Sequence, residues 1–341
     1  MTGNMFSRRN FLQLAGTLAV ASSAGSALFA SGKSQINKVE RVKAALRGER
    51  VDRVPFTCWH HFGLEKQPGE KHAEATIEFY RKFDVDLLKV MSDFPYPAPE
   101  GLEKISQPED WQRVEPLKNP FPEQIKALRL INKELKGQAL FVETIFHSWN
   151  VIEKLSSKKD LAHLKENDPK LFKKVLRAIS ESQANHARLA LDAGAAGIFL
   201  AVSAADQFVT DSQDYVKMGR ESDLIILDAV KDKGTLNILH VHGKKPHWDT
   251  LVTYPVQVMN YSVHGTGVGL TDARRKFTGT VMGGLNEEKI ASQNTEELAG
   301  DLQAAILAMQ KRRFVLSPGC SVPNDISPEV LLQLKELAQK G

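Results

Sequence analysis

Cysteine is scarce in this chain of 341 residues, which contains only Cys58 and Cys320. Two cysteines so far apart exclude a disulfide framework as the basis of the fold, although a single bridge between them stays open. An excess of one charge is also nearly absent, because the formal net charge is only +4. Such a small excess gives no indication of a nucleic-acid partner. The content of 42% hydrophobic and 25% charged residues instead indicates an ordinary soluble globular protein.

Charge is missing from most of the N-terminal segment. The motif Ser7-Arg8-Arg9-Asn10-Phe11-Leu12 precedes an uncharged stretch, rich in Ala, Ser and Gly, that continues to Gly32. We interpret residues 1–32 as a twin-arginine (Tat) signal peptide. A membrane anchor needs about 20 apolar residues, and the many small and hydroxylated residues here disfavour it. The signal predicts the twin-arginine export machinery as a partner and a periplasmic or other extracytoplasmic location. The protein stays cytoplasmic if the signal is not used.

From residue 37 onward, short apolar runs alternate with helical patterns. Repeated strand and helix units are typical of a parallel sheet, and eight of them predict a single (β/α)8 TIM barrel of the α/β class over residues 37–341. No Gly-x-Gly-x-x-Gly follows the first run, which disfavours a dinucleotide-binding sheet. Crossover helices are expected at 169–193, 211–233 and 295–311, and the proline-rich segment 94–122 is expected to form an ordered flap. The apolar runs are 54–61, 86–92, 139–146, 197–203, 236–242, 256–264, 279–284 and 314–317.

Chemically active residue types concentrate at the ends of these runs, where barrel enzymes place their active sites. Six of the ten histidines lie there, and we expect the other four, His72, His163, His186 and His247, at the surface. Each residue alone has an ordinary structural explanation, such as a buried hydrogen bond, a helix cap or an apolar contact. The residues at the run ends are Trp59, His60, His61, Ser92, Asp93, Glu143, His147, Ser203, Asp206, His240, His242, His264, Gly284 and Cys320.

His240 and His242 form the sharpest chemical pattern in the chain. Alternate residues of a strand face the same side, so both imidazoles can point at one target. A thiolate from Cys320, at the end of the last run, would complete a His, His, Cys set with an open fourth position. That arrangement is typical of catalytic rather than structural zinc. Glu143 is a weaker candidate for a further oxygen ligand.

Several separated motifs resemble the uroporphyrinogen decarboxylase superfamily along most of the chain after residue 36. The resemblance implies a (β/α)8 barrel with a deep cleft at the carboxyl ends of the strands. The motifs, in order, are Arg53-Val54-Pro55, Phe83-Asp84-Val85-Asp86 through Ser92-Asp93, Asp272-Ala273-Arg274-Arg275-Lys276 leading to Gly283-Gly284-Leu285-Asn286, and Phe314 to Cys320 followed by Pro323 and Ser327-Pro328-Glu329.

Two branches of that superfamily differ at residues visible here. True decarboxylases carry arginines after the first strand to neutralise substrate carboxylates, and residues 59–64 contain none. Asp93 does resemble their catalytic aspartate, which hydrogen-bonds pyrrole N–H groups. The methylcobamide:coenzyme M methyltransferase branch holds zinc with a His-x-Cys pair and a later cysteine. His240, His242 and Cys320 resemble that set, with one histidine in place of a cysteine, and zinc accepts both ligand types.

These patterns predict an exported, zinc-dependent, methyltransferase-like enzyme that activates a thiol or water at the barrel mouth. The resemblance implies His240, His242 and Cys320 as zinc ligands, and we expect Trp59, His60, His61, Ser203 and His264 to bind substrate. A corrinoid carried by a partner protein is a candidate methyl donor, and a homodimer is expected. The alternatives are a divergent uroporphyrinogen decarboxylase, a tetrapyrrole carboxy-lyase that uses Asp93, and a non-catalytic periplasmic binder of a tetrapyrrole, corrinoid or metal.

Overall fold

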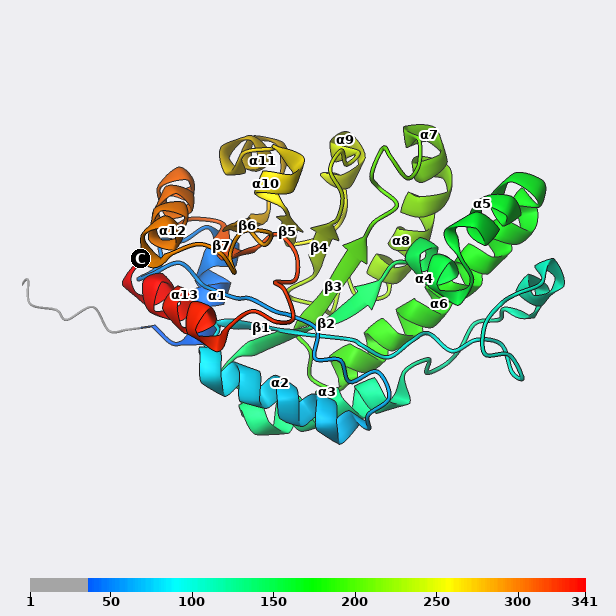
Figure 1. Ribbon diagram of the computed structural model, residues 1–341, viewed down its shortest axis with the longest axis horizontal. Coiled ribbons are helices and arrows are strands. Elements are labelled where there is room, and N and C mark those ends of the chain that lie inside the picture. Colours follow the sequence, from blue (N-terminus) through cyan, green and yellow to red (C-terminus); the bar gives the residue numbers. More distant parts are fainter. Residues whose placement is uncertain (1–35) are drawn as a thin grey trace, which may run out of the picture. The chain divides into compact units, whose positions relative to one another are not determined.

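The computed structural model describes residues 36–341, so the predicted signal peptide at 1–32 lies outside the described residues. Residues 37–341 fold as one unit around a parallel sheet whose strands are hydrogen-bonded in chain order (Figure 1). These strands are almost wholly buried, which explains why they are near-continuous apolar runs in the sequence. They are β1 Leu87–Val90, β2 Leu140–Phe146, β3 Gly197–Val202, β4 Ile238–Val241, β5 Val258–Tyr261, β6 Thr280–Leu285 and β7 Phe314–Pro318.

The first predicted run, 54–61, is not a full strand but closes the barrel. Phe56 forms an isolated parallel bridge with Leu316 of β7. Thr57 N donates to Leu316 O at 3.0 Å, and on the other side Asp86 N donates to Phe56 O at 2.8 Å. Pro55 has no N–H and so shortens the ladder here. The predicted (β/α)8 barrel is therefore confirmed, with the short extended segment around Phe56 in place of one of its eight strands.

A buried carboxylate fixes this closing segment. Asp86 accepts hydrogen bonds from Arg41 at 2.7 Å, from Arg53 at 2.5 Å and from Phe56 N at 2.9 Å. Its side chain is 1% exposed, and Arg41 is 2% exposed. Because a buried charge is tolerated only when it is paired, these contacts hold the segment where few ladder bonds exist.

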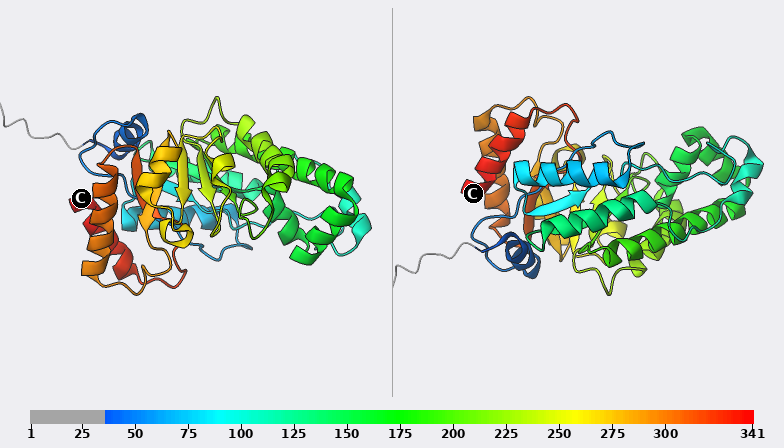
Figure 2. Two further views of the ribbon diagram at one scale, coloured as in Figure 1. Left: turned by 90° about the horizontal axis from the view of Figure 1, so that it is seen from above. Right: turned by 90° about the horizontal axis from the view of Figure 1, so that it is seen from below.

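The helices lie outside the sheet, as the three views show (Figures 1 and 2). Among residues 36–341, none of the helices is long and apolar enough to cross a membrane. The α-helices are α1 Lys38–Arg47, α2 Gly69–Phe83, α3 Pro122–Leu135, α4 Ser148–Leu155, α5 Lys158–Asn167, α6 Pro169–Asp192, α7 Ser212–Asp214, α8 Glu221–Asp228, α9 Trp248–Leu251, α10 Val263–Thr266, α11 Leu270–Lys276, α12 Thr295–Met309 and α13 Pro328–Lys340. Two further helical elements are the 3₁₀ helix η1 Pro108–Arg113 and the π-helical turn η2 Tyr215–Arg220.

Helices are confirmed at two of the three predicted crossover segments, as α6 and α12, and the third is interrupted. The expected helix 211–233 divides into α7, η2 and α8. Gly219 lies in the π turn, where an added Cβ would come 2.5 Å from the Tyr215 ring. The Tyr215 hydroxyl in turn donates to Asp223 Oδ2 at 3.0 Å. The irregular turn is found where this tyrosine packs, and hydrophobic periodicity does not reveal that packing.

The proline-rich segment 94–122 forms an ordered flap, as its sequence predicts. Its regular structure is confined to η1 and the first residue of α3. Tyr96 Oη donates to Ser182 Oγ of α6 at 2.8 Å, and Ile105 N donates to Leu155 O of α4 at 2.9 Å. Trp111 is 3% exposed. These contacts fasten the flap against α4 and α6, beside the carboxyl end of β1.

Candidate functional site

Strand alternation aims two histidines into the barrel. Ile238 of β4 belongs to the apolar cluster that fills the barrel interior, so His240 and His242, two and four residues on, face the same side. Cys320 follows β7 and reaches the same place. One ligand atom from each of the three lies within 4.8 Å of the others. The Cys320 Sγ to His242 Nδ1 distance is 3.9 Å. The structure thus brings the three proposed metal ligands together.

Asn260 of β5 sets the orientation of the His240 ring. Its amide nitrogen donates to Met282 O at 3.2 Å and to Pro318 O at 3.2 Å, which leaves Oδ1 facing His240 Nδ1 at 2.6 Å. An amide oxygen only accepts, so His240 donates through Nδ1, and Nε2 is the ring nitrogen left for a metal. Sequence reasoning missed Asn260. The available signal was a polar residue inside an apolar run.

The imidazoles also determine the charge of the thiol. Burial alone would raise the pKa of Cys320, but hydrogen bonds from His240 and His242 outweigh it and lower that pKa to about 4. The hydrogen bond to Cys320 raises the pKa of His242. Cys320 is therefore a thiolate at neutral pH, which is the form that binds metals. Two imidazole nitrogens and a thiolate with an open fourth position fit catalytic zinc.

These ligands lie on one wall of a cavity of about 210 Å³. Three residues predicted to bind substrate, Trp59, His61 and Ser203, line it too. His60 does not, because its Nδ1 contacts His61 O at 2.8 Å and its ring packs on Phe62. His264 is exposed on α10 and lines neither this cavity nor the chamber beside it.

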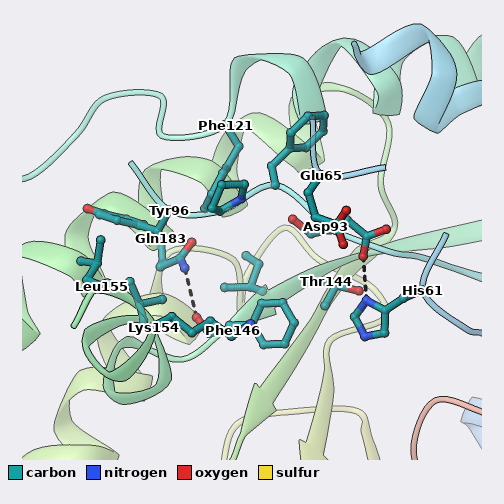
Figure 3. A pocket seen from close by; sticks show the side chains of 15 residues that line it. His61, Glu65, Asp93, Tyr96, Phe121, Thr144, Phe146, Lys154, Leu155 and Gln183 are labelled. Atoms are coloured by element: carbon teal, nitrogen blue, oxygen red, sulfur yellow. Dashed lines mark hydrogen bonds and ion pairs between the residues drawn. The ribbon is translucent and has the colours of Figure 1, made fainter. Parts of the chain in front are cut away.

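A second chamber of about 270 Å³ adjoins the first and shares its walls at His61, Thr144, Phe146 and Lys154. Figure 3 shows Asp93 pointing at His61, with Asp93 Oδ1 2.7 Å from His61 Nδ1. Phe62 N donates to the other carboxylate oxygen at 3.2 Å. Burial would raise the pKa of Asp93, but the hydrogen bond and charge interaction with His61, together with the Phe62 N–H, outweigh it and lower that pKa. Both carboxylate oxygens are thus already engaged within the protein.

Two lysines that sequence reasoning missed supply positive charge. Lys89 lies on β1 between Leu87 and Met91, both in the interior cluster, so its side chain enters the barrel. Its Nζ is 2.7 Å from Met91 Sδ and 4.8 Å from the centre of the Phe199 ring. Burial lowers the pKa of Lys89 to about 7. Lys154 of α4 also lines both chambers, and burial lowers its pKa. Neither lysine forms a salt bridge within the described part of the chain.

Other predicted positions have structural partners instead. Glu143, the weaker candidate ligand, accepts from Gln124 Nε2 at 2.9 Å and contacts His186 Nε2 at 2.9 Å, and it lines neither chamber. His147 is fully buried, and its Nε2 accepts from Ser203 N at 3.2 Å. These polar contacts organise the barrel wall rather than a metal site.

The expectation that four histidines lie at the surface is wrong for three of them. His72, His186 and His247 are 2%, 0% and 9% exposed, and only His163 lies at the surface. His72 Nε2 contacts Leu64 O at 2.7 Å, and His247 Nε2 contacts Thr210 O at 3.0 Å. Each buried ring thus has a hydrogen-bond partner that sequence spacing alone does not predict.

Comparison with known proteins places this barrel in a family. The profile of uroporphyrinogen decarboxylase (URO-D) matches residues 37–341. The chain therefore belongs to the uroporphyrinogen decarboxylase family. A search of curated protein sequences finds no match.

Among solved structures, the fold is similar to that of a methyltransferase from Methanosarcina mazei. The TM-score is 0.71 at 15% identity, over 89% of this chain and 99% of that one. It is also similar to a B12-independent methionine synthase from Shewanella sp. W3-18-1, in complex with selenomethionine. The TM-score there is 0.57 at 12% identity, over 80% of this chain and 87% of that one. At these identities the likeness establishes the shared fold.

Proposed function

We propose that this protein is a zinc-dependent, methyltransferase-like enzyme that activates a thiol at the barrel mouth. The observation that carries the proposal is the meeting of His240, His242 and Cys320 at one wall of a cavity. They come from the ends of two different strands, where barrel enzymes assemble their active sites. The methyltransferase among the proteins of similar fold supports this reaction class.

The chemistry follows from what each residue does. Zinc, when bound, would hold a substrate thiol as thiolate at the open fourth position. Asn260 fixes His240 in the tautomer that presents Nε2. Trp59 and Phe199, packed edge to face 5.3 Å apart, form an apolar wall that reduces access of water. The sulfur would take a methyl group, so that an S–C bond forms as the bond from that methyl group to its donor breaks. The donor, for which we propose a corrinoid on a partner protein, would keep the electron pair of the broken bond. Water is the alternative group to be activated.

The charge of the cavity indicates which thiols it accepts. Lys89 is 6% exposed, whereas Lys154 is exposed where it lines the cavity, and neither forms a salt bridge with a carboxylate among residues 36–341. A cation buried without a partner is costly, so an anionic ligand group would relieve that cost. We therefore propose a thiol that carries an acidic group as the substrate.

The reaction is tested directly with methylcobalamin and a mercaptocarboxylate as probes. Zinc-loaded protein is expected to form the methyl thioether, measured by mass spectrometry, and Cys320→Ala is expected to lose this product. The matched control is Cys58→Ala, because Cys58 is fully buried away from both chambers and burial raises its thiol pKa to about 12. Equal product from zinc-loaded and metal-free wild type would contradict the proposal.

The decarboxylase alternative depends on Asp93. That carboxylate already accepts from His61 and Phe62 N, and its side chain is 0% exposed, so pyrrole N–H groups would have to reach its remaining lone pairs. Turnover of uroporphyrinogen that vanishes in Asp93→Ala would nevertheless establish it. Tight binding of a tetrapyrrole or corrinoid without turnover would establish the non-catalytic alternative.

A further inference from the structure

We infer that His61, held by Asp93, is the proton acceptor for the group activated in the metal cavity. The inference rests on the proposed function and names the residue that removes the thiol proton. His61 lies on the wall shared by the two chambers, so it faces the metal cavity as well as the chamber that contains Asp93.

The tautomer of His61 follows from its partner. Asp93 is ionised and only accepts hydrogen bonds, so His61 Nδ1 carries the proton that bridges the 2.7 Å between them. The lone pair is then on Nε2. Figure 3 shows the other ring nitrogen of His61 pointing away from Asp93. Within residues 36–341, no side chain or backbone group hydrogen-bonds to this Nε2, and 40% of the side chain is exposed. A free lone pair on an oriented imidazole is what general-base catalysis needs.

The backbone around His61 is joined to the loop that carries Cys320. His61 N donates to Asn324 Oδ1 at 3.2 Å, and Val322 N donates to Trp59 O at 3.0 Å. These two bonds fasten the loop after β7 to the segment that closes the barrel. The base and the thiolate ligand are therefore held in one assembly.

The other basic groups of the cavity are less suited to this step. His240 and His242 are the proposed metal ligands, and their ligand atoms lie with that of Cys320 within 4.8 Å of one another. Lys89 Nζ is enclosed by the Met91 sulfur and by the Trp59 and Phe199 rings, 5.4 and 4.8 Å away. Lys154 lies 4.0 Å from the centre of the Phe146 ring, and in Figure 3 it lies on the far side of the chamber from His61.

The step balances as a proton transfer. The S–H bond of the thiol breaks, its electron pair stays on sulfur, and an N–H bond forms at His61 Nε2. The Asp93 carboxylate balances the imidazolium charge. The proton then leaves from the exposed side of His61 to solvent, before any methyl group is transferred to the sulfur. Asp93 acts through His61 and is thus a positioning residue.

The test is the rate of proton release when zinc-loaded protein is mixed with the same mercaptocarboxylate, followed with a pH indicator. We expect His61→Ala to keep its zinc and the final amount of released protons, but to release them about 100-fold more slowly. Added imidazole should restore the rate in His61→Ala, which it would not do if the ring were only structural. Asp93→Asn should also be slow, and His163→Ala, an exposed histidine on α5, should match wild type.

A second measurement does not need the metal. In metal-free protein, ¹⁵N NMR is expected to show the Nδ1–H tautomer of His61, and Asp93→Asn is expected to lose that preference. Zinc-loaded His61→Ala with the wild-type rate of proton release overturns the inference and leaves the proposed function standing. Wild type that holds no zinc, or releases no proton with the thiol, overturns both.

Discussion

Lys89 places an ammonium group among aromatic rings and a sulfur atom, where charge is poorly solvated. Burial lowers its folded-state pKa from the ordinary 10.5 to about 7. Between these values the unfolded chain holds a proton that the folded protein has released. The free energy of unfolding therefore rises with pH across that window. Below it, the buried charge destabilises the fold.

Replacing this cation with an apolar side chain of similar length tests that account. Metal-free Lys89→Met is expected to be more stable than wild type near pH 7 and to lose the rise in stability toward about pH 9.5. Urea unfolding at the two pH values measures both effects. Lys158→Met is the control, because Lys158 is 85% exposed. If Lys89→Met and wild type gain stability equally as the pH rises, the lowered pKa is wrong.

Asn260 acts on the metal site only through His240. Its replacement by leucine removes the acceptor for His240 Nδ1 and frees the ring to change tautomer. We expect the zinc affinity of Asn260→Leu to fall by about 10- to 100-fold, measured by competition with a chelator. His163→Ala should keep the wild-type affinity. An unchanged affinity in Asn260→Leu would show that the hydrogen bond does not orient the ligand.

At the scale of elements, the closing segment 54–61 shows how ion pairs replace ladder hydrogen bonds. Asp86→Ala leaves Arg41 without one of its two carboxylate partners and removes the acceptor for Phe56 N. We expect the free energy of unfolding to fall by about 3–5 kcal/mol, with faster amide exchange at Thr57. Asp84→Asn, at a partly exposed ion pair with Lys38, should change it by less than about 1 kcal/mol. Equal losses in the two variants would contradict this role of Asp86.

Sequence patterns predicted where strands and helices occur better than where they are broken. Seven apolar runs became strands because both faces of a parallel strand are buried, which leaves a continuous signal. The run at 54–61 begins with a similar apolar stretch, yet Pro55 and the paired Asp86 make it a bridge. The helix expected at 211–233 is broken where Tyr215 packs against Gly219. That contact has no periodic signature.

In the candidate site, sequence patterns predicted the three metal ligands but not the residues around them. A period of two placed His240 and His242 on one face, and the position of Cys320 after the last strand brought it near them. Sequence patterns did not predict roles for Lys89, Lys154 and Asn260, because those roles depend on neighbours across the barrel. Asn260, for example, pairs in register with His240 only once β4 and β5 are adjacent.

At the scale of the whole molecule, export and self-association stay predictions. A reporter fused to the full chain should reach the periplasm, and changing Arg8 and Arg9 to lysine should abolish that signal because the twin-arginine machinery reads the pair. Export that persists in the double variant would contradict the signal. The expected homodimer is checked by light scattering on the protein as isolated.

The central claim is a metal centre built from His240, His242 and Cys320, and metal content tests it most directly. Protein purified from its native compartment is expected to hold one equivalent of zinc, measured by mass spectrometry of the metal. His242→Ala and Cys320→Ala should lose it while remaining folded, whereas His163→Ala and Cys58→Ala should keep it. Folded wild-type protein that contains no metal, and binds none when zinc is supplied, would contradict the account.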